Sequence, residues 1–222
     1  YHNPFSEENP TKAVLFIAFF DPTGFRGHRM YPGGRGDVSL ELWTTPTEAS
    51  EGAMPGEIQP GQWRIQIDIR ALSAETEYQL EVYAVEGESS DSEGILEYPA
   101  EHVTKPEPGW YKGELHAHST ESDGRYPVEE VVKAAQDYDL DFLSLTDHTT
   151  CSQWHKLAKL QNDKTALIRS FEITSHLGHA NLHGLSEWVN AYIDQPGWDV
   201  NQAADAVHQQ GGLFCVNHAF SG

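Results

Sequence analysis

The stretch GELHAHSTESDG, residues 113–124, places two histidines two positions apart and a carboxylate five positions after the second histidine. The stretch resembles a strand that runs into a loop, and side chains at positions i and i+2 of a strand point to the same face. His116 and His118 could therefore converge on one metal ion, with Asp123 supplying an oxygen ligand from the loop. The pattern alone leaves a second interpretation open, in which the imidazoles simply belong to a polar strand.

Downstream of this stretch, strand patterns and helix patterns alternate. Apolar residues recur at i, i+3 and i+4 after Pro127, which is a favourable first residue for a helix. Asp199 is a candidate N-cap for a later helix, and Gly211 marks the end of that helix. The expected helices are 127–138, 152–162 and 200–210, and the expected strands are 110–118, 141–148, 166–174 and 213–218. This order predicts an α/β domain, and the expected architecture is a parallel barrel.

Upstream of the stretch, the sequence indicates a different kind of domain. The segments 62–70 and 77–85 alternate apolar and polar residues, as half-buried antiparallel strands do. Two further strands are expected at 11–20 and 37–44, with loops rich in Gly and Pro at 21–36 and 52–61. These features predict a small antiparallel β-sandwich. The predicted organisation is a sandwich over 1–98, a proline-containing linker over 99–109 and the α/β domain over 110–222.

Composition excludes several classes of protein. The chain of 222 residues has 34 acidic and 14 basic residues and a formal net charge of −20, so we expect no nucleic-acid partner. The longest apolar run, 13–20, is too short to span a membrane, and we expect a soluble protein with no membrane partner. The sequence leaves open whether the protein is cytoplasmic or exported, and its oligomeric state. Cys151 and Cys215 have no metal-site spacing and are expected to be free thiols.

The expected strands of the second domain share one property, which is that each ends in residues able to bind a metal. Because the carboxyl ends of parallel strands meet at one rim, these side chains are expected to lie close together. The residues at the four strand ends are His116 and His118, Asp147 and His148, Glu172, and Asn217 and His218. The residues themselves therefore predict a metal site at the rim.

Four motifs in this order resemble those of the polymerase and histidinol phosphatase (PHP) superfamily of metal-dependent hydrolases. The motifs are LHAHSTESDG (115–124), LSLTDH (143–148), SFEIT with GHANLHGL (170–185), and GGLFCVNH (211–218). The domain in front and the segment 172–185 are most similar to the carbaryl-hydrolase-like branch. The resemblance implies a distorted seven-stranded (β/α) barrel whose rim binds two or three divalent ions, zinc, manganese or iron. Such a barrel takes roughly 200 residues or more, so we expect this one to be truncated at its C-terminus and to continue beyond Gly222.

The resemblance also assigns metal ligands. His116, His118 and Asp123 match the first motif, His148 the second, Glu172 the bridging carboxylate and His218 a later histidine. For one further position the motif GHANLHG offers both His179 and His183, and the resemblance favours His179. Asp147 is expected to orient a ligating histidine, and Arg125 is a candidate for holding an anionic substrate.

These assignments predict a metal-dependent hydrolase in which metal-bound hydroxide attacks a small ester substrate without a covalent enzyme intermediate. The chain contains no G-x-S-x-G nucleophile motif. Small phosphoesters rank first because the superfamily implies them, and carbamates or carboxyl esters follow because the nearest branch implies those. The alternatives are a nucleic-acid enzyme, which the acidic charge disfavours, and a non-catalytic binding scaffold.

Overall fold

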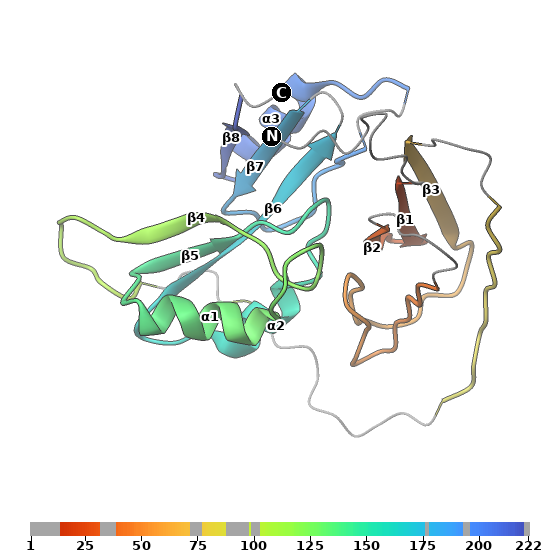
Figure 1. Cartoon of the computed structure of the whole chain (residues 1–222), viewed down its shortest axis with the longest axis horizontal. Coiled ribbons are helices and arrows are strands. Elements are labelled where there is room, and N and C mark those ends of the chain that lie inside the picture. Colours follow the sequence, from red (N-terminus) through yellow and green to blue (C-terminus); the bar gives the residue numbers. More distant parts are fainter. Residues whose placement is uncertain are drawn as a thin grey trace, which may run out of the picture.

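The computed structural model describes residues 14–31, 39–71, 77–87, 98, 103–175, 178–192 and 196–219. These residues form a three-stranded sheet of order β2-β1-β3 and a five-stranded sheet of order β4-β5-β6-β7-β8. The two sheets lie side by side, and the helices belong to the five-stranded one (Figure 1).

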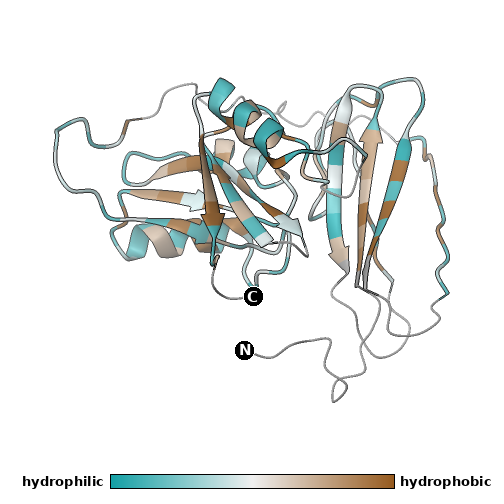
Figure 2. Cartoon of the chain, turned by 90° about the horizontal axis from the view of Figure 1, so that it is seen from above, coloured by the Kyte–Doolittle hydropathy of each residue, from teal (hydrophilic) through white to brown (hydrophobic). Residues whose placement is uncertain are grey.

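The three-stranded sheet is antiparallel, with β1 (Val14–Asp21) between β2 (Gly24–Tyr31) and β3 (Arg64–Ala71). The central strand is the most apolar of the three (Figure 2). A tight turn joins β1 to β2, because Asp21 Oδ1 accepts hydrogen bonds from the backbone N–H groups of Thr23 (2.7 Å) and Gly24 (2.9 Å). This turn explains why 24–31, predicted as part of a loop, forms a strand.

The prediction of a β-sandwich is wrong for the part of the chain that the structure describes. Residues 77–87 run in an extended path without pairing in a sheet, and residues 39–44 contribute one isolated bridge, between Thr44 and Ala49. No second sheet covers β3 within the described ranges, so Ile65 and Ile69 stay exposed. Alternation in the sequence predicted which residues share a face, but it did not specify the partner of that face.

The five-stranded sheet mixes parallel and antiparallel pairs. The strands β4 (Gly113–Ala117), β5 (Phe142–Leu145) and β6 (Ala166–Ser175) are parallel, whereas β7 (Gly178–His183) is antiparallel to both β6 and β8 (Leu213–Asn217). The helices α1 (Val128–Asp137), α2 (Trp154–Leu160) and α3 (Val200–Gln209) precede β5, β6 and β8 respectively.

The prediction of a seven-stranded (β/α) barrel is therefore wrong. The described residues contain three helices and a curled sheet that resembles half a barrel. The difference arises after β6, where the strands β6 and β7 pair from Ser175 and Gly178 onward as a hairpin. A parallel neighbour would need a crossover of a dozen or more residues, and only two residues separate these strands.

A single hydrophobic core holds the helices against the five-stranded sheet. Helix α1 contributes Val128 and Val132, α2 contributes Leu157, and the strands contribute residues such as Leu145 and Phe171, all of them buried. Leu115 on β4 and Leu213 and Val216 on β8 are exposed, so the core does not cover the outer strands completely. No helix among the described residues has the length and apolar character that crossing a membrane requires.

Two hydrogen bonds join the N-terminal half of the chain, which contains the three-stranded sheet, to the loop that follows β4. The Arg29 guanidinium donates to the carbonyl oxygen of Thr120, and the backbone N–H of Gly52 donates to Glu121 Oε2 at 2.7 Å. Glu121 is fully buried and also pairs with Lys156 on α2. The predicted limits of the two domains and the linker remain predictions, since only residues 103–109 of that linker are described.

Candidate metal centre

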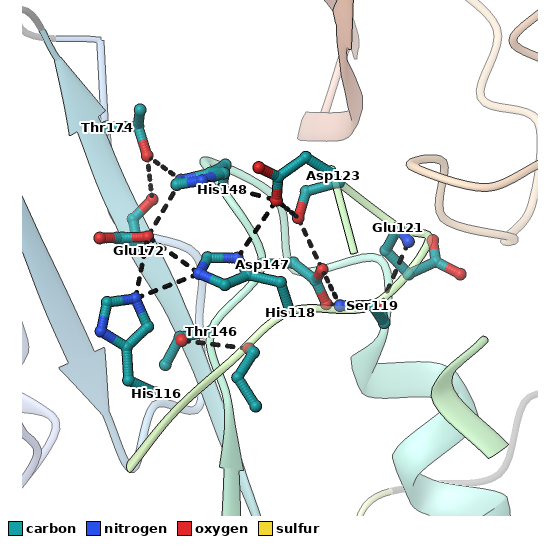
Figure 3. A network of polar contacts seen from close by, with 12 residues as sticks. His116, His118, Ser119, Glu121, Asp123, Thr146, Asp147, His148, Glu172 and Thr174 are labelled. Atoms are coloured by element: carbon teal, nitrogen blue, oxygen red, sulfur yellow. Dashed lines mark hydrogen bonds and ion pairs between the residues drawn. The ribbon is translucent and has the colours of Figure 1, made fainter. Parts of the chain in front are cut away.

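Four neighbouring strands bring histidines and carboxylates to one place. His116 lies in β4 and His118 directly after it, His148 follows β5, Glu172 lies inside β6, and His179 lies in β7. A backbone bridge between His148 and Glu172 aligns the end of β5 with the middle of β6. Figure 3 shows the imidazoles of His116, His118 and His148 converging on the carboxylate of Glu172.

Glu172 is the centre of this cluster. Its side chain is fully buried, and Oε2 lies 3.0 Å from His148 Nδ1, 3.4 Å from His116 Nε2 and 3.4 Å from His118 Nε2. The other oxygen, Oε1, lies 3.0 Å from His179 Nδ1 and accepts a hydrogen bond of 2.8 Å from Asn217 Nδ2. One carboxylate thus contacts imidazole nitrogens through both of its oxygens.

Asp123 extends the cluster toward solvent. Its Oδ1 lies 3.6 Å from His118 Nδ1 and 3.6 Å from His148 Nε2, and its side chain is 45% exposed. Three overlapping groups of potential ligands result, and within each group the ligand atoms lie within 4.8 Å of one another. The groups are His116, His118 and Glu172; His118, Asp123 and His148; and His148, Glu172 and His179.

The pKa values of the residues in the cluster are shifted in different directions. Burial alone would raise the pKa of Glu172, but contacts with His148 and His179 hold this pKa well below its ordinary value. Burial, together with repulsion from His148, lowers the pKa of His118 to about 4. Burial would also lower the pKa of His148, but Asp123 and Glu172 outweigh burial and raise it to about 9. Without an ion, a charged His148 therefore offsets the buried carboxylate.

The structure separates the two histidines of GHANLHG. His179 belongs to the cluster through Glu172, whereas His183 points to a different, buried network in which its Nδ1 lies 2.6 Å from Ser144 Oγ. His218 lies at the border of the cluster, with its Nε2 3.7 Å from Glu172 Oε1 and its side chain 45% exposed.

The sequence named two residues, Asp147 and Arg125, for roles other than metal binding. Asp147 is fully buried and accepts hydrogen bonds from Ser119 N (2.8 Å), Ser119 Oγ (2.8 Å) and Ser122 Oγ (2.7 Å). It therefore holds the loop that carries Asp123, rather than a ligating histidine (Figure 3). Burial raises the pKa of Asp147 to about 6. Arg125 is exposed and forms no ion pair with any described residue.

Two polar residues of the site, Thr174 and Asn181, were not singled out from the sequence. Thr174 contacts His148 Nδ1, and Asn217 donates to both Glu172 Oε1 and Asn181 Oδ1 (2.7 Å). Thr174 lies two positions after Glu172 on the same strand, so the two-residue repeat of β6 would have placed them on one face. His2, His102 and His176 lie outside the described residues.

The residues fit a metal ion on two observations. Glu172 Oε2 and His118 Nδ1 are buried, and no described group is aligned to form a hydrogen bond with either. Moreover, the Nε2 atoms of His116 and His118 face each other at 3.1 Å, so at most one lone pair there can be satisfied by the other ring. Buried polar atoms that make no hydrogen bond are costly, and a bound ion would supply the missing contact.

Comparison of the sequence with protein-family models and with curated protein sequences finds no match.

Proposed function

We propose that this protein is a metal-dependent hydrolase of small ester substrates. The observation that carries the proposal is the environment of Glu172 Oε2, a buried carboxylate oxygen that has three imidazole nitrogens within 3.4 Å and no aligned hydrogen-bond donor. The proposed ligands are His116, His118, Asp123, His148, Glu172 and His179, with His218 at the border. The resemblance of the motifs to the PHP superfamily supports the same assignment.

The donor set indicates the kind of ion. Imidazole and carboxylate ligands suit zinc, manganese and iron, whereas calcium and magnesium prefer oxygen ligands alone. Each of His118, His148 and Glu172 belongs to two of the three groups of potential ligands, which is consistent with two or three ions in close proximity. When bound, such ions act as Lewis acids and lower the pKa of coordinated water, which is the chemistry that ester hydrolysis needs.

The protein's own residues would position the metal ligands and determine from which side a substrate reaches them. Glu172 and its donor Asn217 are buried and anchor the floor of the site, while Asp123 and His218 are the exposed members and mark the side from which a substrate would enter. Asp147 fixes the loop 119–122 through its hydrogen bonds and so positions Asp123.

Three side chains near the cluster or in the core that could act as covalent nucleophiles are poorly placed for that role. Ser144 contacts His183, which is the partner a nucleophilic serine needs, but Ser144 is fully buried. Ser119 is buried as well, and its hydroxyl is engaged by Asp147. Burial raises the pKa of Cys151 far above its ordinary value, so its thiol stays protonated. These placements favour direct hydrolysis by water.

Small phosphoesters are the first substrates to test, followed by aryl carbamates and carboxyl esters. The net charge of −20 disfavours long polyanions. The test uses protein purified without chelator, elemental analysis, and assays with p-nitrophenyl phosphate, bis-p-nitrophenyl phosphate and an aryl N-methylcarbamate with added manganese or zinc. We expect bound metal and turnover that a chelator abolishes. Turnover that survives complete removal of metal would contradict the proposal, and cleavage of the carbamate alone would contradict the ranking of substrates.

A further inference from the structure

A cavity of about 1070 Å³ lies between the three-stranded sheet and the five-stranded half of the molecule. Residues from β1, β2, β3, α2, β6 and the segment 186–192 line it, and none of the proposed metal ligands is among them. Its volume is that of a site for a small molecule. The lining is rich in aromatic side chains, namely Phe20, Phe25, Tyr98, Trp154, Trp188 and Tyr192.

The aromatic walls are ordered by packing against one another. The rings of Phe25 and Trp188 stack with centroids 4.5 Å apart and planes at 4°. Phe20 meets Trp188 and Tyr192 edge to face, at centroid distances of 6.2 and 6.0 Å. Such walls offer flat surfaces on which a further planar ring can stack.

Two arginines line the same cavity. The guanidinium carbon of Arg169 lies 4.4 Å from the ring centroid of Tyr98 and 5.5 Å from that of Trp154, and that of Arg64 lies 5.3 Å from the ring centroid of Phe20. Neither forms an ion pair with a carboxylate among the described residues, and Arg169 Nε is buried without a hydrogen-bond partner. Glu187, the acidic residue of the lining, is exposed.

Arg26 differs from Arg64 and Arg169, because its guanidinium has hydrogen-bond partners within the protein. Arg26 is buried, and its guanidinium donates to Asp21 Oδ2 (3.1 Å), Thr44 Oγ1 (3.1 Å) and Gly56 O (3.0 Å). In a chain with 34 acidic and 14 basic residues, carboxylates are abundant partners for arginine. Two arginines that face an aromatic cavity and have no carboxylate partner within the described ranges can offer their donors to an anion from solution.

We propose that this cavity binds a small planar aromatic anion, an aryl carboxylate or a similar aryl acid. The ring of the ligand stacks among the aromatic walls, and its carboxylate accepts hydrogen bonds from Arg169, with Arg64 supplying a second positive charge. The guanidinium is suited to this role, because its planar set of donors matches a carboxylate. The ligand class follows from charge complementarity and from the flat walls, independently of the metal cluster.

Calorimetric titration of the full chain with 4-phenylbenzoate tests the proposal, and 4-phenylbenzamide serves as the uncharged control of the same shape. We expect saturable binding of the acid and at least about tenfold weaker binding of the amide, because the uncharged amide forms no ion pair with the guanidinium and offers it one acceptor oxygen instead of two. Equal affinity for both compounds, or no binding of the acid, would overturn the proposal.

Variants identify the groups responsible. Arg169→Met keeps the apolar stem and should weaken binding of 4-phenylbenzoate about tenfold, whereas Lys159→Met removes an exposed charge from α2 and should leave binding unchanged. Arg64 is exposed on β3, so Arg64→Met is expected to fold and tests the site even if Arg169→Met does not fold. We expect Arg64→Met to weaken binding of 4-phenylbenzoate about threefold. An affinity equal to that of the parent protein in either arginine variant would overturn the assignment.

The titration is carried out on protein stripped of metal with a chelator. Binding of 4-phenylbenzoate that persists without metal supports a separate site, even if the proposed hydrolase activity fails its own test. Binding that appears only after metal is restored would place the anion at the metal cluster and overturn the proposal for this cavity.

Discussion

Glu172 is the residue whose chemistry can be tested most directly. Glu172→Gln preserves the size of the side chain but removes the charge and replaces one ligand oxygen by an amide nitrogen. Because the carboxylate contacts histidines through both oxygens, we expect metal affinity to fall by at least about tenfold. Calorimetric titration with zinc measures the change. Glu129→Gln, an exposed glutamate of α1, is the matched control, and unaltered metal affinity in Glu172→Gln would contradict the proposed centre.

The two histidines of β7 should behave differently on substitution. His179→Ala removes a contact with Glu172 and should lower the metal content of the purified protein. His183→Ala should leave metal content close to the parent value but lower the midpoint of unfolding in urea, because His183 is buried against Ser144. Elemental analysis and urea unfolding on both variants make the comparison. The opposite pattern would assign His183 to the centre.

We expect His148 to make metal binding by the proposed centre dependent on pH. The pKa of His148, raised to about 9 in the metal-free protein, means that this imidazole carries a proton at pH 7. A ligating imidazole must be neutral, so binding of an ion expels that proton and metal affinity should rise with pH until about pH 9. His118, with a pKa of about 4, releases none over this range. Calorimetry in buffers of different ionisation enthalpy counts the protons, and a count of zero at pH 7 would contradict this prediction.

The same raised pKa has a consequence for the stability of the metal-free protein. Since the folded state holds the proton of His148 more tightly than the unfolded state, this group stabilises the fold fully below about pH 6.5. That contribution is lost as the pH rises through about 9.

Much of the cluster could be predicted from the sequence because its signals are local. The i, i+2 spacing of His116 and His118 and the positions of His148 and Glu172 in apolar runs were sufficient to bring these residues together. The partners of Asp147 were not predictable, because they are a backbone amide and two hydroxyls on a loop. Serine hydroxyls in loops carry no pattern that distinguishes an anchor from a solvated side chain.

At the scale of the element, α3 offers a clean test of local stability. Asp199 caps this helix, since its Oδ1 accepts a hydrogen bond of 2.8 Å from the backbone N–H of Asn201. Asp199→Ala should lower the free energy of unfolding by about 1 kcal/mol, as loss of an N-cap does. Asp205→Ala, at an exposed position inside the helix, is the control and should not show this loss. Urea unfolding followed by circular dichroism measures both.

The helices themselves were predictable from the sequence to within a few residues. Each has a regular apolar repeat, and two of them have a recognisable start, at Pro127 and Asp199. The direction of β7 was not predictable in this way, because a strand has the same alternation in a parallel and an antiparallel pair. What decides its direction is the length of the connection after β6, which is too short for a crossover.

For the whole molecule, the architecture was the least predictable property. Alternation in 62–70 indicated a strand with one apolar face, and β3 is a strand, but the sequence did not specify what would cover that face. No second sheet covers that face in the part of the chain that the structure describes. Pairing between strands depends on segments distant in the chain, and the information for such pairing is not contained in the periodicity of any one segment.

Glu121 limits how freely the two halves of this molecule could be exchanged in evolution or engineering. The half that contains the five-stranded sheet buries this carboxylate and provides Lys156, while the other half provides the N–H of Gly52. Gly52 has a φ of +81°, and a Cβ there would lie 2.4 Å from the carbonyl oxygen of His28, so few other residues could present the donor. In a chimera with a different N-terminal domain, the buried Glu121 carboxylate would lack the hydrogen bond from Gly52, which would destabilise the protein by about 1–3 kcal/mol. The two halves are therefore expected to be inherited together, as a matched pair rather than as interchangeable modules.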